Sequence, residues 1–147
     1  MINEFQGEYR WLSNFVECDI EYNGFIYPSV ENAYQAAKMK NKEDAIKFLN
    51  LTSGQAKQLA KTLPIRNDWG KLKIYYMREF LIQKFSQKPY RDLLMDTCGL
   101  DIIEGNRWGD KYWGVCLKTN NGQNNLGKLI MGIRDINVIM EYTLEND

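Results

Sequence analysis

The spacing of apolar residues between Asp68 and Gln87 is the feature that most constrains the fold of this chain. Large apolar side chains recur there mostly at steps of three and four residues, which is the period of one face of an α-helix. They are Trp69, Leu72, Tyr76, Phe80, Ile82 and Phe85. The pattern predicts a long helix over residues 68–87 with these six side chains on its apolar face.

Shorter helices are predicted on both sides of the long one from capping residues, proline stops and apolar spacing. Their ranges are 30–40 after the cap Ser29, 42–50 after Asn41, 53–63 before Pro64, 89–94, and 126–142. The segment 1–28 is typical of short strands, with a tight hairpin turn at Asn23-Gly24. A brief apolar run over residues 100–103 indicates a further strand. We therefore expect a mainly α fold of the α+β class: one compact helical domain over residues 1–147 with a short N-terminal β-hairpin.

Length and composition fit one ordinary globular domain. The chain has 147 residues, of which 44% are hydrophobic and 26% are charged. Its apolar runs are far shorter than the roughly 20 residues of a membrane span, and its N-terminus lacks the basic and apolar regions of a signal peptide. We expect a cytoplasmic protein without a membrane partner. The scattered positions of Cys18, Cys98 and Cys116 argue against a disulfide framework and against zinc.

The chain contains no histidine. This removes the usual general base near neutral pH, the commonest metal ligand and every Ser-His or Cys-His nucleophile pair. Acid–base chemistry then falls to carboxylates, lysine, tyrosine or cysteine with shifted pKa values. The net charge of zero argues against a module that grips duplex nucleic acid through its phosphates alone. We expect neither a metal nor a cofactor.

The predicted helix after Ser29 carries a candidate chemical face. Glu31, Tyr34, Gln35 and Lys38 stand at i, i+3, i+4 and i+7 and therefore point the same way. One face thus combines a carboxylate, a phenol, an amide and an amine. On spacing alone, an ordinary solvated stripe explains these residues at least as well.

A second candidate region is the glycine-, tryptophan- and asparagine-rich stretch over residues 104–125, which is too long for a mere connection. A disordered excursion fits badly, because it would leave Trp108, Tyr112 and Trp113 in water. Asp110 precedes these last two rings, whose flat faces suit stacking on a base. Taken alone, the pair is better explained by a core Trp113 and an Asp110 that caps a turn. Near the start, Arg10 and Asn14 are weaker candidates for a phosphate and a sugar hydroxyl.

Together these segments resemble the NADAR family, also called YbiA-like proteins. The matching pieces are Leu12-Ser13-Asn14-Phe15, Tyr27-Pro28-Ser29-Val30-Glu31, Tyr34-Gln35-Ala36-Ala37-Lys38, Trp69 with Lys73 and Met77, Lys84-Phe85, Glu104-Gly105-Asn106, Asp110-Lys111-Tyr112-Trp113-Gly114, Gly122-Gln123-Asn124-Asn125-Leu126-Gly127-Lys128 and Ile133-Arg134. They run in order over nearly the whole chain. Only Thr97-Cys98-Gly99-Leu100 departs, where a shorter Thr-Gly turn is expected.

The resemblance implies a mainly helical fold and an N-glycosidase of the glycohydrolase type. It implies removal of ADP-ribose from guanine, in nucleic acid or nucleotide. The alternatives are cleavage of phosphoribosylated riboflavin-pathway intermediates and a non-catalytic module that binds ADP-ribose or NAD. The resemblance assigns catalysis to Glu31, Lys38 and Asp110. It assigns substrate binding to Arg10, Asn14, Tyr34, Gln35, Trp113, Gly114 and Asn124. It also implies a pocket between the first helix, the loop and the start of the last helix. Carboxylates can supply both proton transfers of such a cleavage, and a lysine of lowered pKa offers a Schiff-base route instead.

Overall fold

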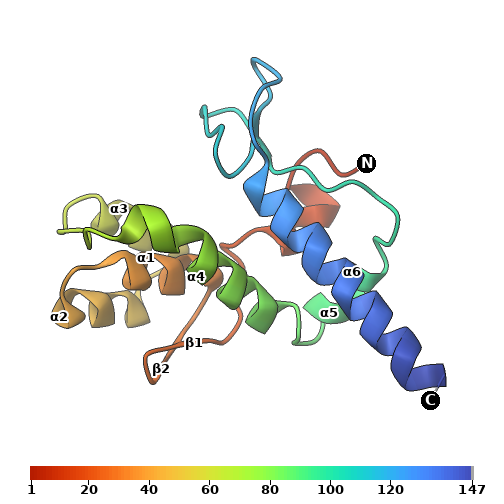
Figure 1. The fold of residues 1–147 in the computed structure, drawn as a ribbon. Helices are drawn as coiled ribbons and strands as arrows, with labels where there is room; N and C mark the ends of the chain where they lie inside the picture. The colour runs from red at the N-terminus through yellow and green to blue at the C-terminus, as the bar shows by residue number, and fades with distance from the viewer. Residues whose placement is uncertain (147) are drawn as a thin grey trace. The chain divides into compact units, whose positions relative to one another are not determined.

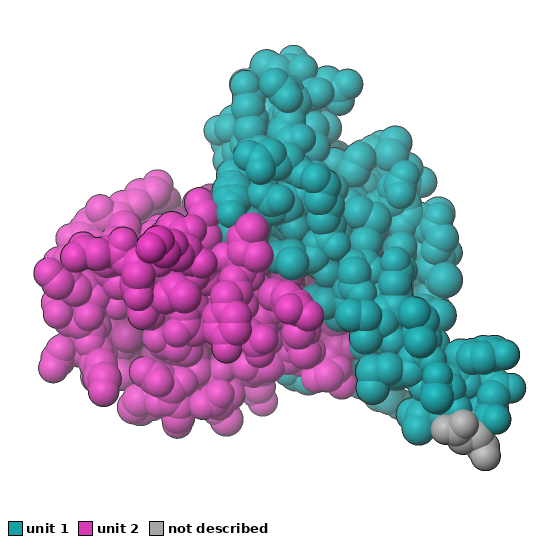
Figure 2. Space-filling model, in the orientation of Figure 1, with its two compact units in different colours: residues 1–13, 87–147 teal, residues 14–86 magenta. Residues whose placement is uncertain are grey.

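The structure, a computed structural model, describes residues 1–146 and divides the chain into two compact units. Unit 1 comprises residues 1–13 and the chain from Gln87 onward, and unit 2 comprises residues 14–86. Figure 2 shows the two units in different colours. The expectation of one domain over residues 1–147 stays a prediction. The fold is α+β, as predicted from the sequence, with helices predominating.

Unit 2 is built around helix α1 (Val30–Lys38), which packs against three other helical elements (Figure 1). These are the 3-10 helix η2 (Ile46–Asn50), α3 (Ser53–Ala60) and α4 (Trp69–Lys84). Every residue of α1 except Lys38 is buried. A helix covered on all sides is a core helix, so its polar residues cannot be a solvated stripe.

The start of α1 is fixed by the cap predicted from the sequence. Ser29 Oγ accepts a hydrogen bond of 3.0 Å from the backbone N–H of Asn32. The buried Asn32 amide in turn donates to the carbonyl oxygens of Phe48 and Leu51, both at 2.8 Å. These bonds tie α1 to the end of η2.

The predicted hairpin is confirmed. Strands β1 (Ile20–Tyr22) and β2 (Phe25–Tyr27) are antiparallel. Both turn residues have positive φ, 55° at Asn23 and 85° at Gly24, as a tight hairpin turn requires. The expectation of strands throughout the segment 1–28 is wrong for Gly7–Leu12 in unit 1, which form the 3-10 helix η1. There the chain satisfies its own backbone locally, for example through Ser13 N–H donating to the carbonyl of Arg10 at 2.9 Å.

The other helices of unit 2 lie close to their predicted ranges. The segment 42–50 divides into α2 (Lys42–Ala45) and η2, and α3 ends at Ala60 rather than at the predicted Leu63. In α4 the prediction for Ile82 is wrong, since this side chain is 40% exposed. A step of two residues from Phe80 leaves the helical face, and Met77, Leu81 and Lys84 are buried instead.

Unit 1 contains α5 (Tyr90–Met95), α6 (Asn125–Asn146), and the short parallel strands β3 (Gly105–Asn106) and β4 (Val115–Cys116). The strand expected over residues 100–103 is reduced to an isolated bridge between Ile2 and Ile102.

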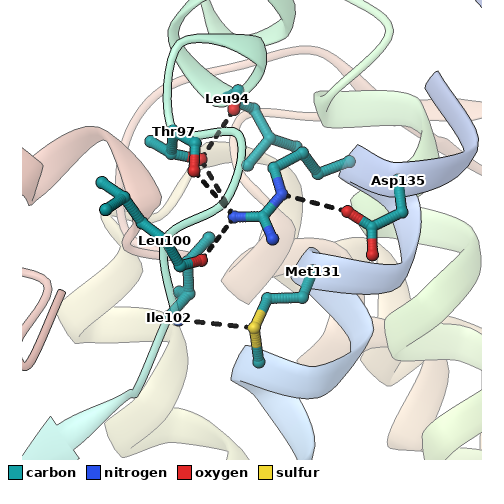
Figure 3. Close-up of polar contacts among 7 residues, drawn as sticks. Leu94, Thr97, Leu100, Ile102, Met131 and Asp135 are labelled. Carbon is teal, nitrogen blue, oxygen red and sulfur yellow. Dashed lines mark hydrogen bonds and ion pairs between the residues drawn. The ribbon is translucent and has the colours of Figure 1, made fainter. Parts of the chain in front are cut away.

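Arg134 on α6 anchors the segment that precedes these strands through hydrogen bonds to Thr97 and Leu100, which Figure 3 labels. Its side chain is 5% exposed, and its Nη1 donates to the carbonyl oxygens of Thr97, at 3.0 Å, and Leu100, at 2.7 Å. Nε of Arg134 pairs with Asp135 at 3.2 Å. The segment that departs from the family pattern therefore wraps around a buried guanidinium within unit 1.

Candidate active site

The polar face of α1 forms a buried cluster in unit 2. Glu31 is 8% exposed and Gln35 6% exposed, while Lys38 is partly buried at the end of the helix. Gln35 Nε2 donates a hydrogen bond of 2.9 Å to Glu31 Oε1, as residues four apart on a helix can. The structure therefore brings a carboxyl group and an amide into direct contact inside a protein core.

Burial shifts the pKa values of Glu31 and Lys38, the two charged groups of α1, in opposite directions. Burial raises the pKa of Glu31, and the hydrogen bond from Gln35 and the charges of Lys57 and Lys38 oppose that rise. Burial lowers the pKa of Lys38; the charge of Glu31 opposes this fall and the charge of Lys73 adds to it. Each group is pushed toward its neutral form, which is common at catalytic sites.

Two buried oxygens of unit 2 lack a hydrogen-bond partner within residues 1–146. They are Gln35 Oε1 and Asn14 Oδ1. Asn14 is placed against the start of α1, because its carbonyl oxygen accepts the N–H of Glu31 at 3.1 Å. Its own amide reaches only the sulfur of Met77, at 3.5 Å. Unpartnered buried oxygens are rare in folded proteins, and a catalytic role is one of the explanations for them.

Aromatic rings from α4 lie beside this helix. The ring of Tyr34 meets Trp69 edge to face, with centroids 5.1 Å apart, and Trp69 stacks on Tyr76 at 6.0 Å. Tyr34 and Trp69 are each 8% exposed. Such rings exclude water from the neighbourhood of α1 and stabilise it by burial.

The second predicted region, the loop over residues 104–125 in unit 1, is organised by its own polar side chains. Asp110 Oδ1 accepts the backbone N–H groups of Tyr112, at 3.0 Å, and Trp113, at 2.9 Å. Asn106 is 1% exposed, accepts the N–H of Asp110 at 3.0 Å and donates to the Asp110 carbonyl at 2.9 Å. One carboxylate oxygen of Asp110 is thus committed to holding a turn.

Asn124 and Gly114 occupy tightly constrained places in the same loop. Asn124 Nδ2 donates to the Ile102 carbonyl and Asn124 Oδ1 accepts the N–H of Glu104, both at 3.0 Å. A Cβ atom at Gly114 would collide with the side chain and the carbonyl of Glu104. Both residues close the loop on itself, and their substrate-binding role stays a prediction.

The rings of the loop differ in exposure. Tyr112 and Trp113 are stacked with centroids 4.8 Å apart and an angle of 1° between planes, and each is partly exposed. Trp108 is 63% exposed, so the expectation that the loop shelters it from water is wrong. Arg10 is exposed on η1.

The predicted residues therefore fall into separate groups. Glu31, Gln35 and Lys38 converge on α1, with Tyr34 on the same helix and Asn14 at its start. Asp110, Trp113, Gly114 and Asn124 belong to the loop of unit 1, and Arg10 belongs to η1. The single pocket that combines these groups stays a prediction.

A surface hollow of about 240 Å³ in unit 2 contains none of the predicted residues. Its walls are Tyr22, Asn23, Phe25, Tyr27, Lys42, Ala45 and Ile46. Burial raises the pKa of Tyr27 to about 12 and also raises the pKa of Tyr22. These phenols stay protonated near neutral pH and make poor general bases there. The candidate site is therefore the polar face of α1 rather than this hollow.

Sequence reasoning missed three residues that contribute to the charge around α1 or to the structure of the loop. Lys57 and Lys73 act on the charged groups of α1, although neither of them was predicted from the sequence as a site residue. Asn106 belongs to the family segment Glu104-Gly105-Asn106, but the resemblance assigned it no role. The effects of the two lysines depend on packing between segments distant in sequence, which spacing does not specify.

Within residues 1–146, no group of three or more cysteine, aspartate or glutamate side chains is placed to hold a metal ion. None of the helices in the same range combines the length and the apolar composition that a membrane span requires.

Comparison with known proteins identifies the family. The sequence model of the NADAR domain matches residues 2–136. The chain belongs to the NADAR family. An N-glycosidase of Nostoc punctiforme is 32% identical over 134 residues, which cover 86% of this chain and 85% of that protein. The N-glycosidase YbiA of Escherichia coli is 30% identical over 132 residues, covering 87% of this chain and 81% of YbiA.

Two further matches are a sequence relative named for riboflavin biosynthesis and a solved structure. A riboflavin biosynthesis protein of Vibrio vulnificus is 30% identical over 129 residues, which cover 85% of this NADAR chain but 35% of that protein. The NMR structure of E. coli YbiA superposes with a TM-score of 0.82 at 26% identity, covering 97% of this chain and 89% of YbiA. The chain is a glycosidase of the NADAR family with the YbiA fold, and the alternative of a non-catalytic module is set aside.

Proposed function

We propose that this NADAR protein hydrolyses an N-glycosidic bond to ribose and that Glu31 is its main acid–base residue. The observation that carries the proposal is the buried Glu31 carboxyl, whose pKa is raised by burial. A raised pKa keeps a carboxyl group protonated closer to neutral pH, which suits a general acid. A chain without histidine needs such a group.

The proposed cleavage begins with transfer of the Glu31 proton to the leaving nitrogen of the base. The bond between ribose C1 and that nitrogen then breaks, its electron pair leaves with the base, and positive charge develops on C1 and the ring oxygen. Water adds to C1, and a carboxylate takes up its proton. Glu31 is the first candidate for this second step, and Oδ2 of Asp110 is the other.

Lys38 supports the same reaction in one of two ways. As an ammonium group it holds a hydroxyl or phosphate of the substrate. As a neutral amine, favoured by its lowered pKa, it forms a Schiff base with the ring-opened sugar. The opposing charge of Glu31 favours the electrostatic role.

We further propose an anionic ribosyl substrate, with ADP-ribose attached to guanine as the first candidate. Lys57 and Lys38 contribute positive potential at Glu31, and Lys73 does so at Lys38, which favours a phosphate-bearing substrate. Substrate contacts are proposed for Tyr34, Gln35 and Asn14 on unit 2, and for Arg10, Trp113, Gly114 and Asn124 on unit 1. Riboflavin-pathway intermediates are the second candidate, favoured by the name of the Vibrio relative.

Chromatography of released base and sugar tests both substrates. We expect the purified chain to release guanosine and ADP-ribose from ADP-ribosylated guanosine, or the pyrimidine from a ribosylaminopyrimidine phosphate, and Glu31→Gln to abolish that release. Glu79→Gln, a matched change at an exposed carboxylate of α4, should leave it intact. Cleavage of neither substrate by the unmodified chain would contradict the proposal.

A further inference from the structure

Gln35 is a buried amide that uses only half of its hydrogen-bonding capacity. Its Nε2 donates to Glu31 Oε1 at 2.9 Å, whereas its Oε1 is buried without a partner within residues 1–146. The side chain is 6% exposed. An unpartnered buried oxygen destabilises the folded chain, and an apolar side chain of similar length would avoid that penalty. The retained amide therefore points to a role toward Glu31.

Glu31 is held at two points by its own unit. The Asn14 carbonyl oxygen accepts its backbone N–H at 3.1 Å, and Gln35 engages its Oε1. The hydrogen bond from Gln35 engages Oε1 and not the other carboxyl oxygen, Oε2. The contacts thus leave one specific oxygen of Glu31 available for proton exchange.

We propose that Gln35 is a positioning residue, which fixes Glu31 Oε1 so that Oε2 is the oxygen that exchanges a proton with the substrate. This inference rests on the proposed acid–base role of Glu31. It assigns to Gln35 a function distinct from a substrate contact, because its amide acts through the carboxyl group of Glu31.

The contact also lowers the pKa of Glu31, against the larger effect of burial. The Gln35 N–H stabilises the ionised carboxylate and so opposes the rise in pKa that burial of Glu31 causes. Removal of the N–H removes this opposition, and the pKa of Glu31 should rise further. A residue that only fills space would leave the pKa almost unmoved.

The decisive variant is Gln35→Met, which keeps the side-chain length and removes the amide. Gln58→Met, on the exposed surface of α3 in the same unit, is the matched control. The ¹³C resonance of the Glu31 carboxyl group, identified by its loss in Glu31→Gln, reports its titration in the ligand-free protein. We expect the midpoint to rise by about one to two pH units in Gln35→Met, as for a lost hydrogen bond to a charged group. The midpoint should be unchanged in Gln58→Met.

Kinetics on the cleaved substrate give the second readout. We expect the limb of the kcat/KM profile that reports Glu31 to move upward by the same amount in Gln35→Met. We also expect kcat to fall by roughly 10-fold or more through misplacement of the carboxyl group, with a smaller change in KM. If Gln35→Met does not fold, Gln35→Leu replaces it, because it also removes the N–H without adding a charge beside Glu31.

Three results separate the two proposals. An unmoved Glu31 titration in the substituted protein overturns the inference about Gln35, whether or not the enzyme turns over. A moved titration with an unmoved kinetic limb also overturns it, because Glu31 would then be tuned without consequence for proton transfer. Full turnover by Glu31→Gln overturns the proposed function, which is a different result from either of these.

Discussion

Polar residues are used differently in helix α1 of unit 2 and in the loop over residues 104–125 of unit 1. In α1, Glu31 and Gln35 contact each other, and Gln35 Oε1 is a buried oxygen that has no partner within residues 1–146. In the loop, Asp110 and Asn124 direct their side chains to backbone groups at 2.9 and 3.0 Å. Both regions match the family pattern, yet of the two pairs only the one on α1 leaves a buried oxygen unpartnered.

This difference separates residues that take part in the reaction from residues that maintain the structure, although both kinds belong to the same family pattern. A side chain whose hydrogen bonds are used by the backbone contributes stability, and its replacement acts through folding. A side chain held in an unfavourable environment contributes reactivity, and its replacement frequently stabilises the protein. Substitutions in the loop should therefore change stability first, and substitutions in α1 should change activity first.

The largest effect on stability is expected from Gly114→Ala in the loop. The new Cβ would collide with the side chain and carbonyl of Glu104, and we expect a loss of about 3 kcal/mol or more of unfolding free energy. Urea denaturation measures it. Gly132→Ala on α6 is the matched control, because open space surrounds that position and alanine favours a helix by up to about 1 kcal/mol. Equal stability of the two variants would mean that the loop is not closely packed.

A smaller loss is expected from Asn124→Gly. Glycine accepts the φ of 54° at this position but loses the two hydrogen bonds to Ile102 and Glu104, at a cost of about 2 kcal/mol. Asn120→Gly, at an exposed position with a φ of 53°, should cost almost nothing. A KM measurement adds the second test. A large rise in KM in Asn124→Gly alone would indicate that Asn124 binds substrate in addition to holding the loop closed.

A gain in stability is expected from Glu31→Gln. The folded-state pKa of Glu31 is raised above its ordinary value of 4.5. Its contribution is therefore fully present below this ordinary value and is lost as the pH rises through the folded-state pKa. Above that range we expect Glu31→Gln to be more stable than the unmodified chain by about 1 kcal/mol. Denaturation at pH 4 and pH 8 measures the difference, and a variant less stable at pH 8 would show that the ionised carboxylate is well solvated.

The smallest effect is expected from Lys38→Met. Burial lowers the pKa of Lys38, so the charged form is disfavoured in the folded state at neutral pH and a neutral side chain relieves the penalty. Since Lys38 is only partly buried, the gain in stability should not exceed about 0.5 kcal/mol. Lys40→Met, at an exposed position, should give no gain. A clear loss of stability in Lys38→Met alone would indicate that its charge stabilises Glu31 more than burial penalises it.

The sequence predicted local features of α1 well. Ser29 as cap and the shared face of Glu31, Gln35 and Lys38 follow from short-range geometry that any helix imposes. The burial of that face could not be predicted, because α3, α4 and η2, which cover α1, come from later parts of the chain.

The loop was less predictable for the same physical reason. Its length and aromatic content indicated an ordered segment, but the exposure of Trp108 and the central place of Asn106 depend on which backbone groups the loop must satisfy. Buried charges also escape prediction from periodicity. Arg134 and Lys84 lie on predicted helices, yet their burial depends on partners that spacing does not specify.

The most direct test compares kcat/KM for Glu31→Gln and Asp110→Asn on the same N-glycosidic substrate, with each variant's folded fraction measured by circular dichroism. Asp110→Asn keeps the Oδ1 that accepts two backbone N–H groups, so both variants should fold. We predict a loss of about 10²–10⁴-fold for Glu31→Gln, the usual contribution of a general acid or base, and a clearly smaller loss for Asp110→Asn. A larger loss for Asp110→Asn, with near-normal turnover by Glu31→Gln, would contradict the placement of the acid–base chemistry on α1.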